Sequence, residues 1–479
     1  MKYSCVIVGG GIVGTSLFSY LARKGISTLL VEKGEDVALG ATKANSGIVH
    51  AGYDCGVNTL KAKLNVEGNL MYPKEAKRLG EKLVKCGSLV VAGSDGYDGI
   101  NDLYNRGITN GVKGMKILKR PAIKKLVPNI ADDIEYALYA KTAAIISPYS
   151  FCIAYAEEGV VNGGKLMLNT EIKKATFDGK EYTLTLSGGE EVKCEFVINC
   201  AGAGVNEVSK VFKAEMLPVK LVKGEYLLLD KGENLTPLPI FPLPTKKGKG
   251  ILVMPTVAGN TALGPTAVDI ENFETSVSPE GVKEIKSKVA GSVQGINYRK
   301  VIKLYAGVRV KVGDDFYIRF SEKADNYLFV AGICSPGLTS APAIAEYVAN
   351  LLKQKGVAFD ENKKAVRRKP YTKINNMCNF RLNRLVKKDS DYGRVVCRCE
   401  NITAGEIKEV LNGPIKPLTT DGVKRRLRTT MGRCQGSFCY PTILDIMSKH
   451  YNVDKKQIKF KSKSSVVTGD IKEGGIYDL

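Results

Sequence analysis

The sequence predicts an α/β protein in which a Rossmann-type nucleotide-binding domain carries an inserted, mostly antiparallel β-sheet substrate subdomain and precedes a small, mainly helical C-terminal domain. Three observations support this prediction. The chain opens with an apolar strand, a glycine-rich turn, a helix and a second strand. Residues 220–317 change to short strands separated by turns rich in Pro and Gly. Close to the C-terminus, four cysteines form two tight pairs among helical patterns.

The N-terminal segment has the pattern of a first βαβ unit. "YSCVIV" predicts a buried strand over residues 3–8, and "TSLFSYLARKG" predicts a helix that ends at Gly25. Between them, Gly9, Gly11 and Gly14 form a GxGxxG turn. In such a turn the first glycine allows the tight bend, the second lets the backbone approach a pyrophosphate, and the third allows close helix packing.

Glu32 strengthens the prediction of a dinucleotide site. It lies 18 residues after Gly14, at the end of the next predicted strand, "STLLVEKG". A carboxylate at this place can accept hydrogen bonds from ribose hydroxyls, while the helix N-terminus offers N–H groups to phosphates. NAD and FAD both suit this pattern.

The rest of the chain predicts where this first domain ends. "YTLTL" and "VKCEFVINCAG" read as a hairpin that continues into a buried strand. "NYLFVAGI" returns as a strand, and "SAPAIAEYVANLLKQKG" follows as a helix with Pro in its first turn. We therefore predict the following division: a dinucleotide-binding domain over 1–355 with its inserted subdomain at roughly 75–140 and 215–320, a basic linker over 356–395, a cysteine domain over 396–451 and a tail over 452–479.

Composition and charge indicate a soluble protein with anionic partners. Hydrophobic residues make up 44% of the chain and charged residues 25%, which is ordinary for a globular protein. No apolar run approaches the about 18 residues of a membrane span, and the N-terminus lacks the features of a signal peptide, so we expect a cytoplasmic protein. The net charge of +22 favours anionic substrates, acidic proteins or peripheral contact with anionic membranes. Nothing in the sequence favours nucleic acid.

The segment "GATKANSGIVHAGYDCG" after the glycine turn resembles the FAD-dependent oxidoreductases of the D-amino-acid oxidase superfamily. The resemblance continues in "VINCAG" and in "AGICSPGLTSAPAIA", and it implies FAD as the cofactor. In that superfamily the first segment crosses the flavin, and the last loop and helix face the pyrimidine edge of the ring. The residues that the resemblance assigns to FAD binding, beyond the turn and Glu32, are Thr42, Asn45, Ser46, Gly47, Ala201, Gly202, Gly332, Gly337, Leu338 and Thr339.

Four further motifs, "NSGIVHAG", "KGEYLLL", "PTVAGNTALGPTA" and "YAGVRVK", look like the branch with L-2-hydroxyglutarate oxidases and anaerobic glycerol-3-phosphate dehydrogenases. This resemblance implies that His50 accepts the hydroxyl proton of the substrate while hydride leaves for the flavin. It also implies that Arg309 grips a substrate carboxylate or phosphate. Lys223, Lys311 and Arg319 are weaker candidates for the anion site.

Cys397 and Cys399 form one short clip, and Cys434 and Cys439 form a second. Four thiolates in two clips can hold one soft metal centre, and a cytoplasmic setting argues against disulfides. Zinc remains open, although its sites are more often built from CxxC pairs. "CRCENIT" and "MGRCQGSFC" resemble the 2Fe-2S domain related to bacterioferritin-associated ferredoxin, which implies a 2Fe-2S cluster. "TAGEIKEVL" and "DGVKRRLRTT" predict helices between the clips, and "PTILDIM" predicts the start of another.

Together these features predict an FAD-dependent dehydrogenase of a small anionic secondary alcohol. Glycerol 3-phosphate is the first candidate substrate and L-2-hydroxyglutarate the second. Electrons would leave through a 2Fe-2S centre to an acceptor protein or partner subunit. Oxidation of an amino or imino acid is the alternative enzymatic interpretation, and a metal-clip docking module on a flavoprotein is the non-enzymatic one.

Overall fold

The computed structural model describes residues 1–479 except 234, 245–249, 361–363, 463–464 and 466–479. Most of the predicted tail over 452–479 therefore lies outside the described residues. The described chain forms two compact units. The larger unit comprises Met1–Glu32 and Val37–Arg368, and the smaller unit comprises Lys33–Asp36 and Lys369–Leu479. Among the described residues, no helix is both long enough and apolar enough to cross a bilayer.

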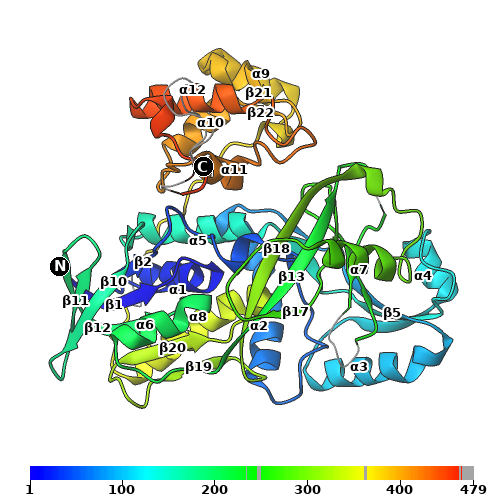
Figure 1. Ribbon diagram of the computed structural model, residues 1–479, viewed down its shortest axis with the longest axis horizontal. Helices are drawn as coiled ribbons and strands as arrows, with labels where there is room; N and C mark the ends of the chain where they lie inside the picture. The colour runs from blue at the N-terminus through cyan, green and yellow to red at the C-terminus, as the bar shows by residue number, and fades with distance from the viewer. Residues whose placement is uncertain (234, 245–249, 361–363, 463–464, 466–479) are drawn as a thin grey trace. The chain divides into compact units, whose positions relative to one another are not determined.

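The core of the larger unit is an eight-stranded sheet with parallel central strands (Figure 1). β1 pairs in parallel with β2 and β12, and β12 pairs in parallel with β20. This confirms the predicted Rossmann-type sheet. Its strands are β1 (Lys2–Val8), β2 (Thr28–Val31), β9 (Lys165–Met167), β10 (Ile172–Phe177), β11 (Tyr182–Leu186), β12 (Glu191–Asn199), β19 (Tyr317–Phe320) and β20 (Tyr327–Ala331).

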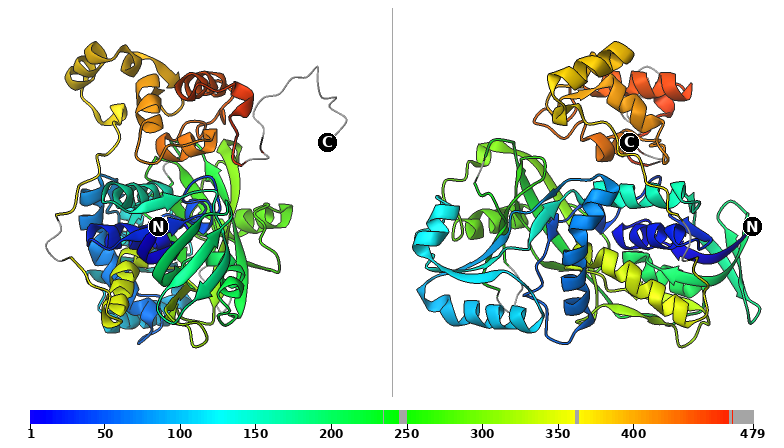
Figure 2. Two further views of the ribbon diagram at one scale, coloured as in Figure 1. Left: turned by 90° about the vertical axis from the view of Figure 1, so that its left-hand side faces the viewer. Right: turned by 180° about the vertical axis from the view of Figure 1, so that it is seen from behind.

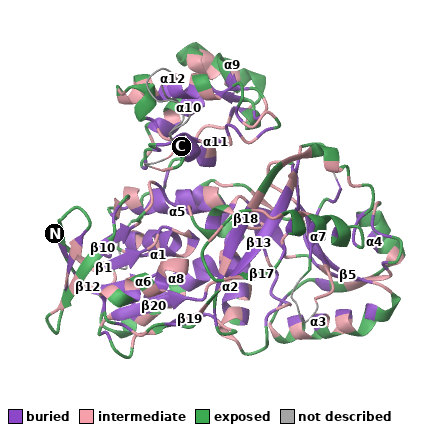
Figure 3. Ribbon diagram, viewed as in Figure 1, coloured by how far each residue is buried: buried purple, intermediate pink, exposed green. Residues whose placement is uncertain are grey.

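Four helices of the larger unit pack against one another in the order α2, α8, α1, α5. They are α1 (Ile12–Arg23), α2 (Leu60–Leu79), α5 (Pro148–Val161) and α8 (Gly337–Gln354). The central strands and the inner faces of these helices are buried (Figure 3), because they share one apolar cluster that includes Ile7, Leu17 and Ile344. The glycine turn thus stands where the parallel sheet meets α1.

The helix α8 corrects one detail of the sequence prediction. It begins at Gly337, so Pro342 lies inside the helix and not in its first turn. A proline in this place lacks the N–H that would bind the carbonyl of Leu338. The hydroxyl of Tyr72, a fully buried residue of α2, donates to that carbonyl over 2.6 Å instead. A donor from another helix therefore lets α8 continue through the proline.

A nine-stranded, mostly antiparallel sheet forms the second layer of the larger unit (Figures 1 and 2). Its strands come from residues 88–140 and 219–312, and only β14 and β5 pair in parallel. They are β5 (Ser88–Ala92), β6 (Met115–Lys119), β7 (Tyr136–Ala140), β13 (Val219–Leu229), β14 (Ile240–Pro242), β15 (Leu252–Pro255), β16 (Thr261–Gly264), β17 (Val268–Ile270) and β18 (Val301–Val312). This confirms an inserted antiparallel sheet.

Smaller elements complete the larger unit. A three-stranded sheet joins β3 (Ile48–Val49), β8 (Ala144–Ile146) and β4 (Leu83–Val84). The short helices are α3 (Tyr97–Thr109), α4 (Arg120–Leu126), α6 (Val205–Val211), α7 (Pro279–Val289) and the 3₁₀ helix η1 (Ala41–Lys43).

The smaller unit is mainly helical, as predicted. It contains α9 (Asn379–Lys388), α10 (Ala404–Leu411), α11 (Thr420–Leu427), α12 (Tyr440–Tyr451) and the hairpin β21 (Val395–Cys397) and β22 (Ile402–Thr403). The three helices expected around the cysteines are present. Thr403 caps α10 with a capping box. The Thr403 N–H donates to the Glu406 carboxylate, and the Glu406 N–H donates to the Thr403 hydroxyl.

The segment 356–395 has more structure than the predicted linker. It contains the helix α9, and Arg368 is a buried member of the larger unit. The Arg368 guanidinium pairs with Glu157 over 2.6 Å and donates to the carbonyl of Leu79 over 2.8 Å. The basic composition of the segment predicted a solvated stretch, but long-range partners bury this one cation.

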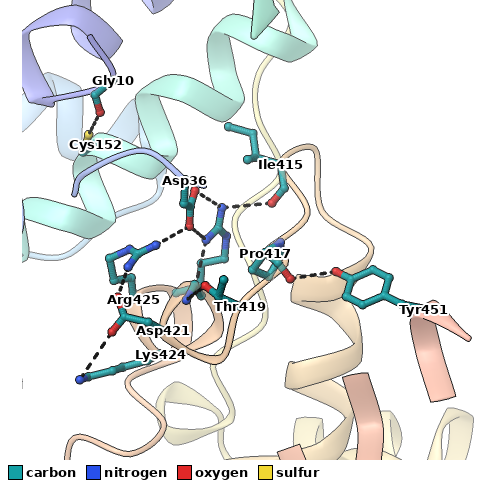
Figure 4. A network of polar contacts seen from close by, with 12 residues as sticks. Gly10, Asp36, Cys152, Ile415, Pro417, Thr419, Asp421, Lys424, Arg425 and Tyr451 are labelled. Atoms are coloured by element: carbon teal, nitrogen blue, oxygen red, sulfur yellow. Dashed lines mark hydrogen bonds and ion pairs between the residues drawn. The ribbon is translucent and has the colours of Figure 1, made fainter. Parts of the chain in front are cut away.

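Four residues from the N-terminal part of the chain belong to the smaller unit, namely Lys33–Asp36. The Asp36 carboxylate is buried and accepts from Arg425 over 2.8 Å and from Arg426 over 2.6 and 3.1 Å (Figure 4). Arg425 also pairs with Asp421. Burial alone would raise the pKa of Asp36, but the two guanidinium groups overcome this effect and hold the pKa below its ordinary value of 3.8.

Candidate cofactor and substrate sites

The glycine turn leaves open space only where a phosphate would need it. Gly9 has φ +113°, and a Cβ on it would lie 2.6 Å from the carbonyl oxygen of Cys200. A Cβ on Gly14 would lie 2.0 Å from the carbonyl oxygen of Gly9, so α1 packs directly on the turn. A Cβ on Gly11, at the helix N-terminus, would have the Thr42 hydroxyl at 3.5 Å as its nearest neighbour. These are the three mechanical roles expected from the sequence.

Glu32 and Thr42 already contact the turn. The Gly10 N–H donates to the Glu32 carboxylate over 2.6 Å, and the Ile12 N–H donates to the Thr42 hydroxyl over 3.0 Å. The first turn of α1 carries no acidic side chain, which leaves the positive end of the helix available to an anion. The geometry fits a dinucleotide whose pyrophosphate lies on the turn and whose ribose lies beside Glu32.

The segment predicted to cross the flavin is held by its own asparagine. Asn45 donates to the carbonyls of Ala41 and Thr42 over 3.0 and 2.9 Å and accepts from the Gly47 N–H over 2.8 Å. Its side chain therefore shapes the segment, whereas the resemblance implied a direct contact with the cofactor. Gly47 has φ +68°, and Ser46 beside it is half-buried.

Ala201 and Gly202 follow β12 at the edge of the sheet that carries the turn. A Cβ on Gly9 would lie 3.0 Å from Ala201 Cα, so Gly9 and Ala201, both predicted to bind the cofactor, are neighbours. The Ala201 N–H donates to the Asn199 side chain over 3.1 Å, and Gly202 has φ +58°. The bend after β12 is thus fixed beside the glycine turn.

The predicted terminal flavin loop contacts His50 through Thr339. Gly332 bends the chain after β20 with φ +64°, and Gly337 begins α8. The Thr339 hydroxyl accepts from the His50 N–H over 2.8 Å. The two ends of the predicted flavin site are therefore joined by a hydrogen bond across 289 residues of sequence.

The backbone of His50 is fixed by hydrogen bonds at both its N–H and its carbonyl. Its carbonyl accepts from the side-chain amides of Asn65 and Asn69 over 3.0 and 3.1 Å. Its half-buried ring lies against Phe241, with the ring centroids 5.8 Å apart. The two asparagines, one turn apart on α2, were not predicted from the sequence, although buried polar residues at i and i+4 are a recognisable signal.

Arg309 lies on β18 with its guanidinium over Gly224 of the neighbouring strand β13. A Cβ on Gly224 would lie 2.4 Å from Arg309 Nη2, so only glycine leaves room for the guanidinium here. Arg309 donates to the carbonyl of Thr266 over 2.7 Å and hydrogen-bonds Tyr226. These contacts hold the cation in place and use part of its donor set.

Two contacts connect Arg309 with the His50 region. Gly307, two residues before Arg309, passes so close to the Ala44 carbonyl that a Cβ would lie 1.9 Å from its oxygen. Tyr226 and Phe241 belong to one apolar cluster, which thus borders both the arginine and the histidine ring. The strand with the anion-binding candidate therefore runs beside the segment predicted to cross the flavin.

The weaker anion-site candidates have other surroundings. The Lys223 ammonium is buried and pairs with Glu274 and, over 3.6 Å, with Glu225. Glu225 in turn accepts from the Ser278 N–H over 2.7 Å at the start of α7. Lys311 is exposed, and Arg319 is exposed over the ring of Tyr317. Lys223 thus serves an internal ion-pair network.

In the smaller unit, the four sulfur atoms form two pairs, each with one member from each clip. The sulfur atoms of Cys399 and Cys434 are 3.6 Å apart, and Cys397 hydrogen-bonds Cys439. Gly432 makes this approach possible, because a Cβ on it would lie 2.1 Å from Cys399 Cβ. The hydrogen bond with Cys439 lowers the pKa of Cys397 to about 6 and raises the pKa of Cys439.

Backbone N–H groups surround these sulfur atoms. Those of Thr430 and Glu400 donate to Cys397, and those of Gly436 and Phe438 donate to Cys434. Thr430 and Gly436 have positive φ angles of 64° and 100°, which turn successive amides inward. Such a nest of amides stabilises a negatively charged centre.

A spacing of 3.6 Å between the sulfur atoms of Cys399 and Cys434 suits two thiolates on one metal atom, either zinc or iron. Two irons with two thiolates each would use all four sulfur atoms of the clips.

Fold and site together define a class: a two-domain oxidoreductase with a dinucleotide cofactor and a separate four-thiolate iron–sulfur domain. Comparison with protein families agrees. Residues 4–351 match the model described as "FAD dependent oxidoreductase", and residues 395–449 match "BFD-like [2Fe-2S] binding domain". The chain belongs to the FAD-dependent oxidoreductase family, and its cofactors are FAD and a 2Fe-2S cluster.

Similar proteins share more than the fold. The chain is 38% identical to a glycerol 3-phosphate dehydrogenase of Caloramator mitchellensis, over 98% of this chain and 99% of the relative. It is 30% identical to a glycerol 3-phosphate oxidase of Mycoplasma genitalium, over 73% and 94%. Among solved structures, the FAD-bound L-α-glycerophosphate oxidase of Mycoplasma pneumoniae superposes with a TM-score of 0.72 and 26% identity, covering 76% of this chain and 97% of that one.

Proposed function

We propose that the protein oxidises glycerol 3-phosphate to dihydroxyacetone phosphate and delivers the two electrons, one at a time, to an acceptor protein. The main support is the glycerol 3-phosphate dehydrogenase that matches over nearly the whole chain, the iron–sulfur domain included. The match to a glycerol 3-phosphate oxidase covers only 73% of this chain but 94% of that relative. The 2Fe-2S domain therefore fits a dehydrogenase that hands its electrons to another protein.

In this proposal the residues of the larger unit bind and orient. When bound, FAD accepts a hydride and the 2Fe-2S cluster carries single electrons. Gly9, Gly11, Gly14 and Glu32 hold the dinucleotide part of FAD. The other predicted cofactor residues surround the flavin, directly or by shaping its segment.

Arg309 and His50 act on the substrate. The guanidinium binds the phosphate, and its remaining donors suit two phosphate oxygens at once. His50 takes the proton from the hydroxyl group at the carbon to be oxidised, for which an imidazole is suited near neutral pH. Thr339, Asn65 and Asn69 fix the His50 backbone, from which the ring reaches the substrate.

Anaerobic stopped-flow spectroscopy of the holoprotein tests this function. Glycerol 3-phosphate, L-2-hydroxyglutarate, glycine and L-proline are mixed separately with the oxidised enzyme, and flavin and cluster absorbance are followed together. We expect rapid bleaching with glycerol 3-phosphate alone. Faster bleaching by L-2-hydroxyglutarate, or release of amine from an amino acid, would replace the proposed substrate. Iron and sulfide analysis of the same sample excludes a purely zinc-holding clip.

A further inference from the structure

One pair of cluster-binding sulfur atoms opens toward solvent and the other does not. Cys397 and Cys439 are 2% and 1% exposed. Cys399 and Cys434, whose sulfur atoms are 3.6 Å apart, are only partly buried. An electron leaving the smaller unit has its shortest way out through the second pair, because electron transfer weakens steeply with distance.

Three exposed residues are adjacent in sequence to the cysteines of the two clips. Arg398 lies between the two cysteines of the first clip, and Arg433 directly precedes Cys434. Phe438 directly precedes Cys439 and is 80% exposed, the highest exposure of any large apolar residue of the smaller unit that the structure describes. Its backbone N–H donates to Cys434, so the backbone of Phe438 lies beside the partly buried pair.

We propose that Arg398, Arg433 and Phe438, which we call the clip surface, form the docking surface for an acidic one-electron carrier protein. An aromatic side chain between arginines is a composition typical of interface hot spots. The charge of the surrounding chain fixes the sign of the partner: residues 369–462 contain 20 Lys/Arg against 8 Asp/Glu, a net charge of +12. This inference rests on the proposed function and names its acceptor by charge.

The electron balance sets the stoichiometry. Oxidation of one secondary alcohol to a ketone releases two electrons and two protons. Two carrier molecules therefore dock in turn, each is reduced by one electron, and the protons go to solvent. The clip surface must release a reduced carrier before the next one binds, so we expect a weak, salt-sensitive complex.

Rubredoxin, a small acidic protein with one iron in four thiolates, is a suitable probe, and basic cytochrome c is its counter-probe. Binding of oxidised rubredoxin to the holoprotein is measured by calorimetric titration at several salt concentrations. Its reduction by holoprotein pre-reduced with dithionite is followed by stopped flow. We expect rubredoxin to bind and to react faster at low salt, and cytochrome c to show the opposite salt dependence.

Substitutions distinguish binding by the clip surface from binding by the overall positive charge of the smaller unit. Arg398→Glu and Arg433→Glu should each weaken rubredoxin binding roughly tenfold at low salt, and Phe438→Ala should weaken it at every salt concentration. Arg384→Glu is the matched control, since this exposed arginine lies on α9 outside both clips and its substitution changes the charge equally. Iron and sulfide content must be unchanged in all four variants.

Three outcomes would overturn the inference. If Arg384→Glu weakens rubredoxin binding as much as the clip-surface substitutions do, binding depends on net charge alone. If rubredoxin and cytochrome c show the same salt dependence, the carrier is not selected for its acidic charge. Binding to anionic phosphatidylglycerol vesicles that is lost in the clip-surface variants, without rubredoxin binding, would assign the surface to a membrane. Because dithionite replaces the alcohol, these results stand even if glycerol 3-phosphate fails to reduce the flavin.

Discussion

At the scale of single residues, the candidate substrate site depends on residues that neighbouring groups hold in position. The backbone of His50 is placed by hydrogen bonds with Thr339 and Asn65, and the guanidinium of Arg309 is placed by Thr266 and by the absence of a side chain at Gly224. Substitutions of these residues therefore separate chemistry from positioning.

His50→Asn should slow anaerobic flavin reduction by glycerol 3-phosphate by about 10²–10⁴-fold, because the hydroxyl proton loses its acceptor. Flavin content should not change, since the contacts that fix residue 50 use backbone atoms. The matched control is His450→Asn, which alters the only other histidine in the chain. An unchanged rate would remove His50 from the proposed chemistry.

Gly224→Ala should raise the KM for glycerol 3-phosphate roughly tenfold with little change in kcat, a cost of about 1.4 kcal/mol in binding. The new methyl group would lie 2.4 Å from Arg309 Nη2, and the flexible guanidinium is the group that can move. Steady-state kinetics measure the effect. Gly188→Ala, which meets no neighbouring atom within 4 Å, should leave KM unchanged. The same KM in both variants would contradict the role of Arg309.

At the scale of elements, a side chain of α2 supplies the hydrogen-bond donor that the proline in α8 lacks. Pro342 was visible in the sequence and predicted a helix start, but the helix begins five residues earlier. The prediction failed because the missing donor is replaced by Tyr72, a contact across 266 residues that no local pattern contains. Helix propensities describe the chain locally, whereas this carbonyl is satisfied by tertiary structure.

Tyr72→Phe should destabilise the larger unit by about 1–3 kcal/mol, since the partly buried carbonyl of Leu338 would lose its donor. The temperature at which flavin fluorescence is released measures the change. Tyr97→Phe removes a hydroxyl from a tyrosine that is 45% exposed and should cost less than about 0.5 kcal/mol. Equal release temperatures for the two variants would show that the α2–α8 hydrogen bond adds no stability.

The elements that carry local chemistry were the ones the sequence predicted well. The glycine turn and Glu32 stand together because the turn and the strand are close in sequence and each glycine has a steric reason. The two cysteine clips indicated a shared centre for a similar reason. The Lys223–Glu225–Glu274 network and the asparagines that hold His50 could not be predicted, because strands and helices distant in sequence bring them together.

At the scale of the whole molecule, the excursion of Lys33–Asp36 ties the two units by covalent structure. The chain leaves the larger unit after Glu32, whose carboxylate accepts from the Gly10 N–H, and soon after its return the Ala38 N–H donates to the Gly10 carbonyl. Both ends of the excursion are therefore held by Gly10 of the glycine turn, and Asp36 between them binds two arginines of the smaller unit.

Asp36→Asn should destabilise the smaller unit of the full-length protein by about 3–5 kcal/mol, because two buried guanidinium groups lose their counter-charge. Denaturant unfolding, followed by cluster absorbance and circular dichroism, measures the change. Asp391→Asn, which removes a partly exposed carboxylate paired with Lys408, should cost at most about 1 kcal/mol. Equal costs would contradict the importance of the buried network.

The difference in stability between wild type and Asp36→Asn should depend on pH in a defined way. The pKa of Asp36 in the folded state is below its ordinary value of 3.8, so its contribution to stability is complete above that value and is lost as the pH falls through the folded pKa. The difference between wild type and Asp36→Asn should be constant from about pH 5 to 8 and shrink below about pH 4. A constant difference down to lower pH would show that Asp36 does not titrate in this way.

The excursion also limits how the protein can be divided. A fragment cut at the obvious place, from Lys369 to the C-terminus, would keep both cysteine clips but lose Asp36, the carboxylate that Arg425 and Arg426 share. Asp421 would remain as the acid paired with Arg425. Four residues of an N-terminal loop thus make the tail a dependent part, and a transplant of this iron–sulfur module into another enzyme would need to carry an acidic side chain with it.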